Sequence, residues 1–308
     1  MQTVYAIGET VLDIIFKEGK PVAAKAGGSM LNACVSLGRM NVPVSFISEY
    51  AADEAGNLID GFLKENNVST EYANRFNDGK THLALAFLNE KNNATYNFYK
   101  EYPADRLTKS FPDVKENDIV MYGSIYSILE EIRPRFLSFL QAAKEKGAIL
   151  VYDPNFRAAH LKELPRIKPF ILENISLATI IRGSDEDFSH IFGAGSAKEA
   201  FDAMGDICKY LVYTENEKGV TFISPKMQLK VPARKITPVS TIGAGDNFDA
   251  GMVYSIFRNK IELSTLILLN DDAWRNIIST GIDFASEVCM SYENYISPAF
   301  AGTYLQGK

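Results

Sequence analysis

The chain of 308 residues has few residues of the kinds that cross-link small folds or hold metals. Its cysteines, Cys34, Cys208 and Cys289, are odd in number and far apart, so neither a disulfide framework nor a zinc site is expected. The three histidines are equally scattered. These absences favour a cytoplasmic protein whose fold depends on its hydrophobic core.

Long apolar runs and clusters of basic residues are also missing. No stretch of about 18 apolar residues could span a bilayer, and the first residues lack the basic-then-apolar pattern of a signal peptide. The net charge is −6 without a long basic run, so we expect neither a membrane nor a nucleic-acid partner. An anionic nucleotide stays compatible with this charge, because a helix N-terminus is locally positive.

Apolar residues make up 46% of the chain, enough for a large core. Short β-rich apolar runs are bounded by turn residues, and most are too continuously apolar for a sheet with one wet face. These runs are 3–8, 43–48, 118–124, 148–155, 177–184 and 210–224. Helical patterns lie between many of them, as at 29–40 and 133–147. The alternation predicts an α/β fold with a doubly wound, mostly parallel sheet and helices on both faces.

Residues 80–100 interrupt this alternation with two strands of alternating polarity, joined near the polar stretch NEKNNA. Such a hairpin has no obvious place in a doubly wound sheet. We therefore expect it to stand apart as a small β lid.

The stretch VSTIGAGDNFDAGMV, residues 239–253, places three small residues before Asp246 and an apolar helical pattern after it. Small residues let backbone N–H groups approach a ligand, and the first N–H groups of a helix are unpaired, so this turn can bind an anion. It is not a Walker A loop, because no lysine follows the last glycine. An anion site beside a carboxylate suits phosphoryl transfer, although a plain capped helix accounts for the same four residues.

The segment KAGGSMLNACVSLGRM together with STIGAGDNFDAG resembles the ribokinase-like sugar kinases of the PfkB family. The resemblance covers almost the whole chain and includes GET…D at 8–13, ADEAG at 52–56 and DPNFR at 153–157. It implies one ribokinase-like domain over residues 1–308, with lid segments at roughly 9–26 and 78–104. In relatives the lid often also forms a dimer contact, so a homodimer through the lid is implied, with Tyr96, Phe98 and Tyr99 as lining residues.

The resemblance also assigns roles to individual residues. Asp246 matches the catalytic base, and Gly243, Ala244 and Gly245 match the turn that forms the anion hole. The positions that grip the sugar hydroxyls are Asp13, Gly27, Gly28 and Asn32. Arg157, which follows the strand that ends in DPN, is a candidate for contact with phosphate or with an acidic substrate group.

The nucleotide and metal positions match less closely. Thr214, Gly219, Ser184 and Ser286 stand at positions that border the nucleotide, together with Gly245, although Ser286 lies in a segment (285–297) that departs from the family's helix. Asp187, with Asp185 or Glu186 as alternatives, is implied as the support for Mg²⁺. Ser240 replaces the acid that helps relatives bind K⁺, so activation by a monovalent cation is in question.

These features predict a magnesium-dependent kinase that transfers phosphate from ATP to a hydroxymethyl group of a small sugar. The pattern favours a fructokinase. A 2-keto-3-deoxygluconate kinase is the alternative, since Lys100, Arg106 or Arg157 would receive its carboxylate. A non-catalytic sugar-binding regulatory protein is a further alternative, whereas a dinucleotide oxidoreductase is excluded because no G-x-G-x-x-G follows the first strand.

Overall fold

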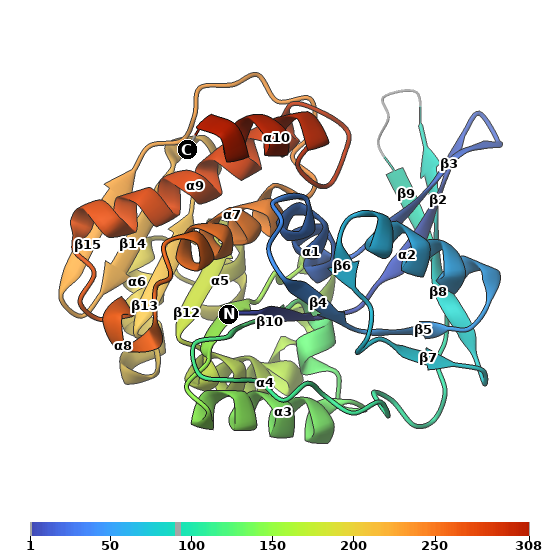
Figure 1. The fold of residues 1–308 in the computed structure, drawn as a ribbon, viewed down its shortest axis with the longest axis horizontal. Helices are drawn as coiled ribbons and strands as arrows, with labels where there is room; N and C mark the ends of the chain where they lie inside the picture. Colours follow the sequence, from blue (N-terminus) through green and yellow to red (C-terminus); the bar gives the residue numbers. More distant parts are fainter. Residues whose placement is uncertain (1, 90–93, 308) are drawn as a thin grey trace.

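A computed structural model describes residues 2–89 and 94–307 of the chain. The described residues form a nine-stranded sheet in the order β15-β14-β13-β12-β11-β10-β1-β4-β6 (Figure 1). Its strands are β1 (Val4–Ile7), β4 (Val44–Ile47), β6 (Val68–Ser69), β10 (Ile119–Gly123), β11 (Ile149–Asp153), β12 (Ile180–Ser184), β13 (Tyr210–Thr214), β14 (Val220–Ser224) and β15 (Met227–Val231).

The seven strands β6, β4, β1, β10, β11, β12 and β13 are parallel to one another, and β14 and β15 are added antiparallel at one edge. The expected doubly wound, mostly parallel sheet is therefore confirmed. The apolar run at 210–224 is not one strand, because it turns back at Asn216 and Gly219, both of which have positive φ. The structure thus places β13 and β14 as neighbours in one hairpin.

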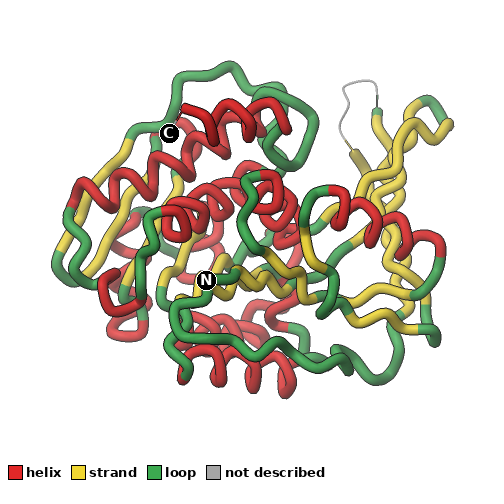
Figure 2. Tube along the Cα trace, viewed as in Figure 1, coloured by secondary structure: helices red, strands yellow, loops and turns green. Residues whose placement is uncertain are grey.

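Helices cover both faces of the sheet (Figures 1 and 2). One face carries α1 (Ser29–Arg39), α2 (Glu54–Glu65), α7 (Ala244–Arg258), α8 (Leu263–Leu266), α9 (Asp271–Cys289) and α10 (Pro298–Gly307). The other face carries α3 (Arg133–Glu145), α4 (Leu164–Leu177), α5 (Asp185–Phe192) and α6 (Ala197–Met204). Short 3-10 segments lie at Ile125–Ile128, Ala158–Glu163, Gly205–Ile207 and Asn216–Lys218.

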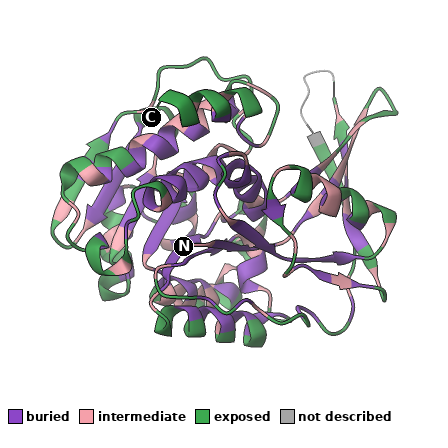
Figure 3. Cartoon of the chain, viewed as in Figure 1, coloured by how far each residue is buried: buried purple, intermediate pink, exposed green. Residues whose placement is uncertain are grey.

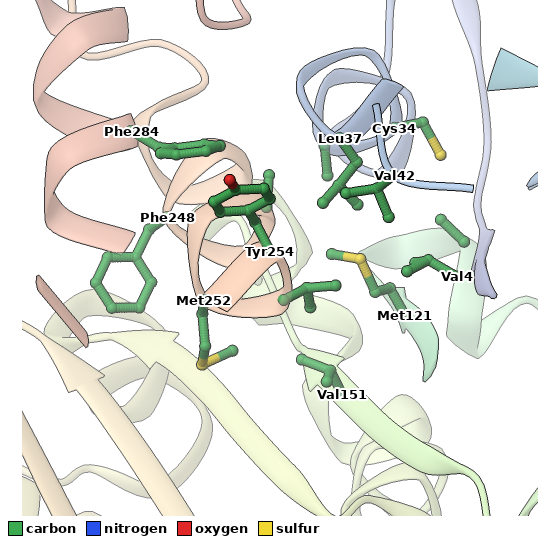
Figure 4. Packing of buried hydrophobic residues seen from close by; sticks show 14 of the residues in the cluster. Val4, Cys34, Leu37, Val42, Met121, Val151, Phe248, Met252, Tyr254 and Phe284 are labelled. Carbon is green, nitrogen blue, oxygen red and sulfur yellow. The ribbon is translucent and has the colours of Figure 1, made fainter. Parts of the chain in front are cut away.

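Alternate residues of each central strand enter two separate cores, because successive side chains of a strand point to opposite faces. Ile180 of β12 packs into the core under α1, α7 and α9, whereas Ile181 packs into the core under α3 to α6. Figure 3 shows this burial in the centre of the molecule, and Figure 4 shows Phe248 and Tyr254 of α7 near Phe284 of α9. The fully buried strands explain why the sequence shows continuous apolar runs there.

A second, four-stranded sheet has the order β3-β2-β8-β9. It consists of β2 (Val11–Lys17), β3 (Lys20–Gly27), β8 (Lys80–Leu88) and β9 (Ala94–Glu101), and a further pair joins β5 (Glu49–Ala51) to β7 (Asn74–Phe76). Strands β8 and β9 form the expected hairpin. The polar tip expected near residues 89–94 includes 90–93, which lie outside the described residues.

Three further features bear on the sequence predictions. All three cysteines are buried free thiols. Within the described residues, no helix combines the length and the apolar character needed to cross a membrane. The segment 285–297 is helical only as far as Cys289, where α9 ends.

Candidate active site

The large sheet has its switch point between β1 and β10. From β1 the chain builds outward through β4 and β6, and it later returns to build the other half through β10, β11, β12 and β13. In open α/β sheets, ligands bind at such a point, beyond the carboxyl ends of the strands. A cavity lies there, lined by residues 8–11 after β1, residues 28–30 and residues 124–126 after β10.

The double glycine closes one wall of this cavity by letting two loops touch. Gly28 has a φ of 135°, and a Cβ on it would lie 2.4 Å from the carbonyl oxygen of Glu9. A Cβ on Gly27 would lie 2.6 Å from Asp13 Oδ2. Gly28 therefore requires glycine, whereas a side chain at Gly27 would displace the Asp13 carboxylate, so the pair lets Asp13 lie close to the start of α1.

Asp13 is partly buried on β2 and has no hydrogen-bond partner among the described residues. Burial raises its pKa to about 6. An unpaired carboxylate beside a cavity has its acceptor oxygens available for the hydroxyl groups of a ligand.

The turn at 243–245 opens α7 as the sequence predicts. Gly243 is the N-cap with a φ of 79°, and a Cβ there would lie 2.9 Å from the carbonyl oxygen of Asn294. The N–H of Ala244 donates to Thr241 O at 3.3 Å, whereas those of Gly245 and Asp246 donate to no described residue. Two backbone donors and the helix dipole are thus free for an anion.

Asp246, in the first turn of α7, lies directly against the start of α1. Its Oδ1 accepts from Ser29 Oγ at 2.6 Å, and its Oδ2 accepts from Asn32 Nδ2 at 2.8 Å. Asn32 Oδ1 is buried and has no partner among the described residues. The structure therefore brings Asp246 together with Asn32 and with Ser29, which lines the cavity, from segments more than 200 residues apart.

Behind the turn lies a buried group of charges. Arg182 of β12 bonds Asp153 Oδ2 at 2.9 Å and Thr214 Oγ1 at 3.0 Å, and its Nε is 3.9 Å from Asp249 of α7. Burial alone would lower the pKa of Arg182, but the two acids raise it above its usual value. Burial and the neighbouring Asp153 raise the pKa of Asp249 well above its usual range, which favours its neutral form.

Ser184 and Asp187 form a capping box at the start of α5. Asp187 Oδ2 accepts from both the N–H and the hydroxyl of Ser184 at 2.7 Å, and Oδ1 accepts from Phe156 N at 2.5 Å. Burial raises the pKa of Asp187. These bonds leave little capacity for direct metal coordination, so Asp187 does not fit as a direct Mg²⁺ ligand.

In residues 2–89 and 94–307, no group of three His, Cys, Asp or Glu side chains is placed to hold a metal ion. Mg²⁺ commonly keeps its water and binds substrate phosphates, without a cage of protein ligands. Ser240 is also engaged locally, because its Oγ accepts from Ile242 N at 3.2 Å.

Two further nucleotide candidates are Gly219 and Ser286. Gly219 has a φ of 97° in the β13–β14 hairpin, and a Cβ there would lie 2.3 Å from Val231 O. Ser286 is half-buried near the end of α9. No hydrogen bond between described residues joins either of them to residues 243–245.

Lys100, Arg106 and Arg157 are the cations expected to receive the carboxylate of an acidic substrate. Lys100 Nζ lies 3.0 Å from Glu9 Oε1, and Arg106 is buried against Glu49 at 2.5 Å. Arg157 is exposed, makes no ion pair with a described residue, and lines a small cavity next to the first one.

Several residues of this site escaped the sequence analysis. Ser29 belongs to the segment that resembles the family, and Asp153 begins the stretch DPNFR, but the sequence predicts a role for neither residue. Arg182 and Asp249 carried a usable signal, because Arg182 interrupts an apolar strand and Asp249 is followed directly by the apolar residues of a buried helix. Ser124 carried none, since its φ of 59° and ψ of −175° appear only in the structure.

The chain matches a known protein family over most of its length. The model described as "pfkB family carbohydrate kinase" matches residues 1–265. "Probable fructokinase-4" of Arabidopsis thaliana is 29% identical over 245 residues, covering 77% of this chain and 74% of that protein. "Fructokinase" of Rhizobium leguminosarum bv. trifolii is 27% identical over 278 residues, covering 87% and 84%.

Solved structures share the fold at lower identity. A fructokinase from Vibrio cholerae O395 with fructose, ADP and calcium ion superposes with a TM-score of 0.84 at 20% identity, covering 99% of both chains. An aminoimidazole riboside kinase from Salmonella enterica, complexed with aminoimidazole riboside and an ATP analogue, superposes with a TM-score of 0.82 at 19% identity. The superposition covers 99% of this chain and all of the other.

Proposed function

The chain belongs to the pfkB family of carbohydrate kinases, and from this premise we propose that it transfers the γ-phosphoryl group of ATP to a hydroxymethyl group of fructose. One observation carries the proposal. The Asp246 carboxylate lies beside the free N–H groups at the start of α7 and is held by Ser29 and Asn32 at the edge of the switch-point cavity.

In the proposed reaction, the cavity between the double glycine and Ser124 holds the sugar. Asp13 and the free Oδ1 of Asn32 accept hydrogen bonds from its hydroxyl groups. These contacts turn the hydroxymethyl group toward Asp246, which takes the hydroxyl proton as the sugar oxygen attacks phosphorus.

The new P–O bond to the sugar forms as the P–O bond to ADP breaks, and ADP leaves with the electron pair. The N–H groups of Gly245 and Asp246 stabilise the charge on the transferring phosphoryl oxygens. Nucleotide-bound Mg²⁺ would offset phosphate charge, with Asp187 acting only through water.

The choice of fructose over an acidic sugar rests on the cations. Lys100 and Arg106, expected receptors for a carboxylate, are each already paired with an acid, Glu9 and Glu49. Burial alone would raise the pKa of Glu9, but hydrogen bonding from His82 and the charge of Lys100 lower it to about 2. Glu9 lines the cavity and is ionised near neutral pH, and because Lys100 is paired with it, this cation is not free to receive a substrate carboxylate.

The test is an ADP-release assay with ATP and Mg²⁺ across fructose, 2-keto-3-deoxygluconate, ribose, tagatose and a nucleoside, each with and without K⁺. We expect turnover with fructose. Asp246→Asn should lower kcat by roughly 10²–10⁴-fold while fructose still binds, because one proton acceptor contributes about that much.

A matched control is Asp271→Asn, which changes an exposed first-turn acid of α9 and should leave kcat unchanged. Wild-type turnover by Asp246→Asn would remove this residue from the mechanism. Binding of ATP and sugar without any product would favour a regulatory protein.

A further inference from the structure

Arg182 is a buried cation with no role in the mechanism so far. Along β12 it shares a face with Ile180, which belongs to the core under α7, so its side chain points at the first turns of that helix. Its side chain is only 9% exposed. A charge at such a place requires partners that offset the loss of water.

The guanidinium group of Arg182 lies directly against the proposed anion hole. A Cβ on Gly245 would come within 2.7 Å of its Nη1 and 3.1 Å of its Nη2. The ring of Phe248, one turn further along α7, lies 5.5 Å from the guanidinium carbon. The turn therefore rests on Arg182, and glycine at 245 is what permits the contact.

The donors of Arg182 are only partly used. Of its five N–H donors, Asp153 and Thr214 take one each, and the buried Nε has no hydrogen-bond partner among the described residues. Asp153 is held at the end of β11 and Thr214 at the end of β13, so the guanidinium plane is fixed from two neighbouring strands. A fixed cation with spare donors, next to free backbone N–H groups, is organised for an anion.

We propose that Arg182 is a positioning residue for phosphoryl transfer, which braces the Gly243–Gly245 turn and keeps a fixed positive charge beside the transferring phosphoryl group. This inference rests on the proposed function. As the P–O bond to ADP breaks and the bond to the sugar oxygen forms, the turn must hold its N–H groups on the phosphoryl oxygens. The competing explanation is that Arg182 only neutralises Asp153 and Asp249 in the core.

Arg182→Gln and Arg182→Lys separate the two explanations. The matched control is Arg133→Gln, since Arg133 is equally buried and bonds Ser127 O and Asn174 on the opposite face of the sheet. For each variant, the melting temperature, kcat, KM for fructose, and the dissociation constants of ADP alone and of ADP with aluminium fluoride, Mg²⁺ and fructose would be measured.

We expect Arg182→Gln to lower kcat about 10²–10³-fold, as the loss of one oxyanion-hole donor does, with KM for fructose within about threefold of wild type. Its affinity for ADP should change little, whereas its affinity for the aluminium fluoride complex should fall with kcat. The kcat of Arg182→Lys should be at least about tenfold higher than that of Arg182→Gln, because lysine restores the positive charge. Arg133→Gln should melt earlier and keep its kcat.

A folded Arg182→Gln protein with kcat within threefold of wild type would overturn the inference, and so would an equal loss of kcat in Arg133→Gln. If Arg182→Gln does not fold, Arg182→Lys decides: a kcat above one hundredth of wild type supports the inference, and a lower one overturns it. If the wild type phosphorylates no sugar, the proposed function fails. The aluminium fluoride comparison needs no turnover, and equal affinity of wild type and Arg182→Gln would then overturn the role of Arg182 separately.

Discussion

At the scale of single residues, Asp13 holds a carboxyl group where the protein disfavours its charge. Burial raises its pKa to about 6, and no described residue donates a hydrogen bond to it. A carboxyl whose pKa is higher in the folded chain than in the unfolded chain stabilises the fold at low pH, and that contribution is lost as the pH rises through about 6. The proposed sugar contact thus carries a cost in stability at neutral pH.

Asp13→Asn should therefore separate stability from binding. At pH 8 we expect the variant to be more stable than wild type by on the order of 1–2 kcal/mol, with the difference vanishing below about pH 4. Urea unfolding across this pH range measures it. Fructose affinity should fall at every pH, and in the wild type KM for fructose should rise as the pH drops below about 6. A less stable variant at pH 8 would mean that Asp13 has a partner in the folded protein.

Ser124 stores strain in the backbone at the carboxyl end of β10. Its φ of 59° and ψ of −175° fall in a region that is essentially restricted to glycine. Its N–H donates to Asp153 O at 3.0 Å, and its carbonyl accepts from Ser127. These hydrogen bonds to Asp153 and Ser127 hold the backbone of Ser124 in the strained conformation. The residue lines both cavities of the site.

A pair of substitutions tests this strain. Ser124→Gly removes both strain and hydroxyl and should raise stability by about 1 kcal/mol, whereas Ser124→Ala removes only the hydroxyl and should leave stability nearly unchanged. If the hydroxyl contacts the sugar, KM for fructose rises equally in both. Melting temperatures and steady-state kinetics on the two proteins suffice. An alanine variant more stable than the glycine variant would refute the strain.

At the scale of elements, the starts of α1 and α7 are joined through buried polar groups. Asn247 Nδ2 donates to Gly243 O and to Asn294 O, both at 2.7 Å, and its Oδ1 accepts from Ser36 of α1. Ser36 Oγ also accepts from Ile296 N at 3.1 Å. Asn247 thereby fixes the anion-hole turn to α1 and to the segment after α9.

Asn247→Ala should lower the free energy of unfolding by roughly 2–4 kcal/mol, because it removes three side-chain hydrogen bonds and leaves Asn294 O without its side-chain donor and the Ser36 hydroxyl without its acceptor. Urea denaturation measures the loss. Asn259→Ala is the matched control, since Asn259 bonds Ser255 at the exposed end of the same helix and should cost under about 1 kcal/mol. A similar loss of unfolding free energy in both variants would show that the hydrogen bonds between α1 and α7 contribute little to stability.

The elements themselves were largely predictable, whereas their contacts were not. Apolar runs predicted β1, β4, β10, β11 and β12, and the small-residue turn predicted the start of α7, since these signals are local. The bonds of Arg182 to Asp153 and Thr214 depend on β12 lying between β11 and β13, which no local pattern encodes. The resemblance supplied Asp246 and Asn32 as separate residues, but their hydrogen bond required the packing of α1 against α7.

At the scale of the whole molecule, one row of side chains crosses the small sheet toward the site. Register places Lys25, Asp13, Ala84 and Phe98 opposite one another on successive strands, so they share a face. Lys25 forms an ion pair with Glu293 at 2.7 Å, and the neighbouring Asn294 lies against Gly243 of the anion-hole turn. This face of the small sheet therefore points toward the anion hole. Phe98 is 60% exposed and stacks on Tyr96, whereas Tyr99 pairs with Leu83 outside that row.

We therefore expect this sheet to close over bound sugar with Phe98 and Tyr96 facing the ligand, since closure excludes water from the phosphoryl group. Hydrogen exchange of β9 amides should slow when fructose and a non-hydrolysable ATP analogue are added, while β15, at the far edge of the large sheet, should be unaffected. Repeating the measurement at low and high protein concentration separates closure of the sheet from formation of a dimer through it. Protection that follows protein concentration and ignores ligand would assign this aromatic face to a dimer and leave the sheet without a lid function.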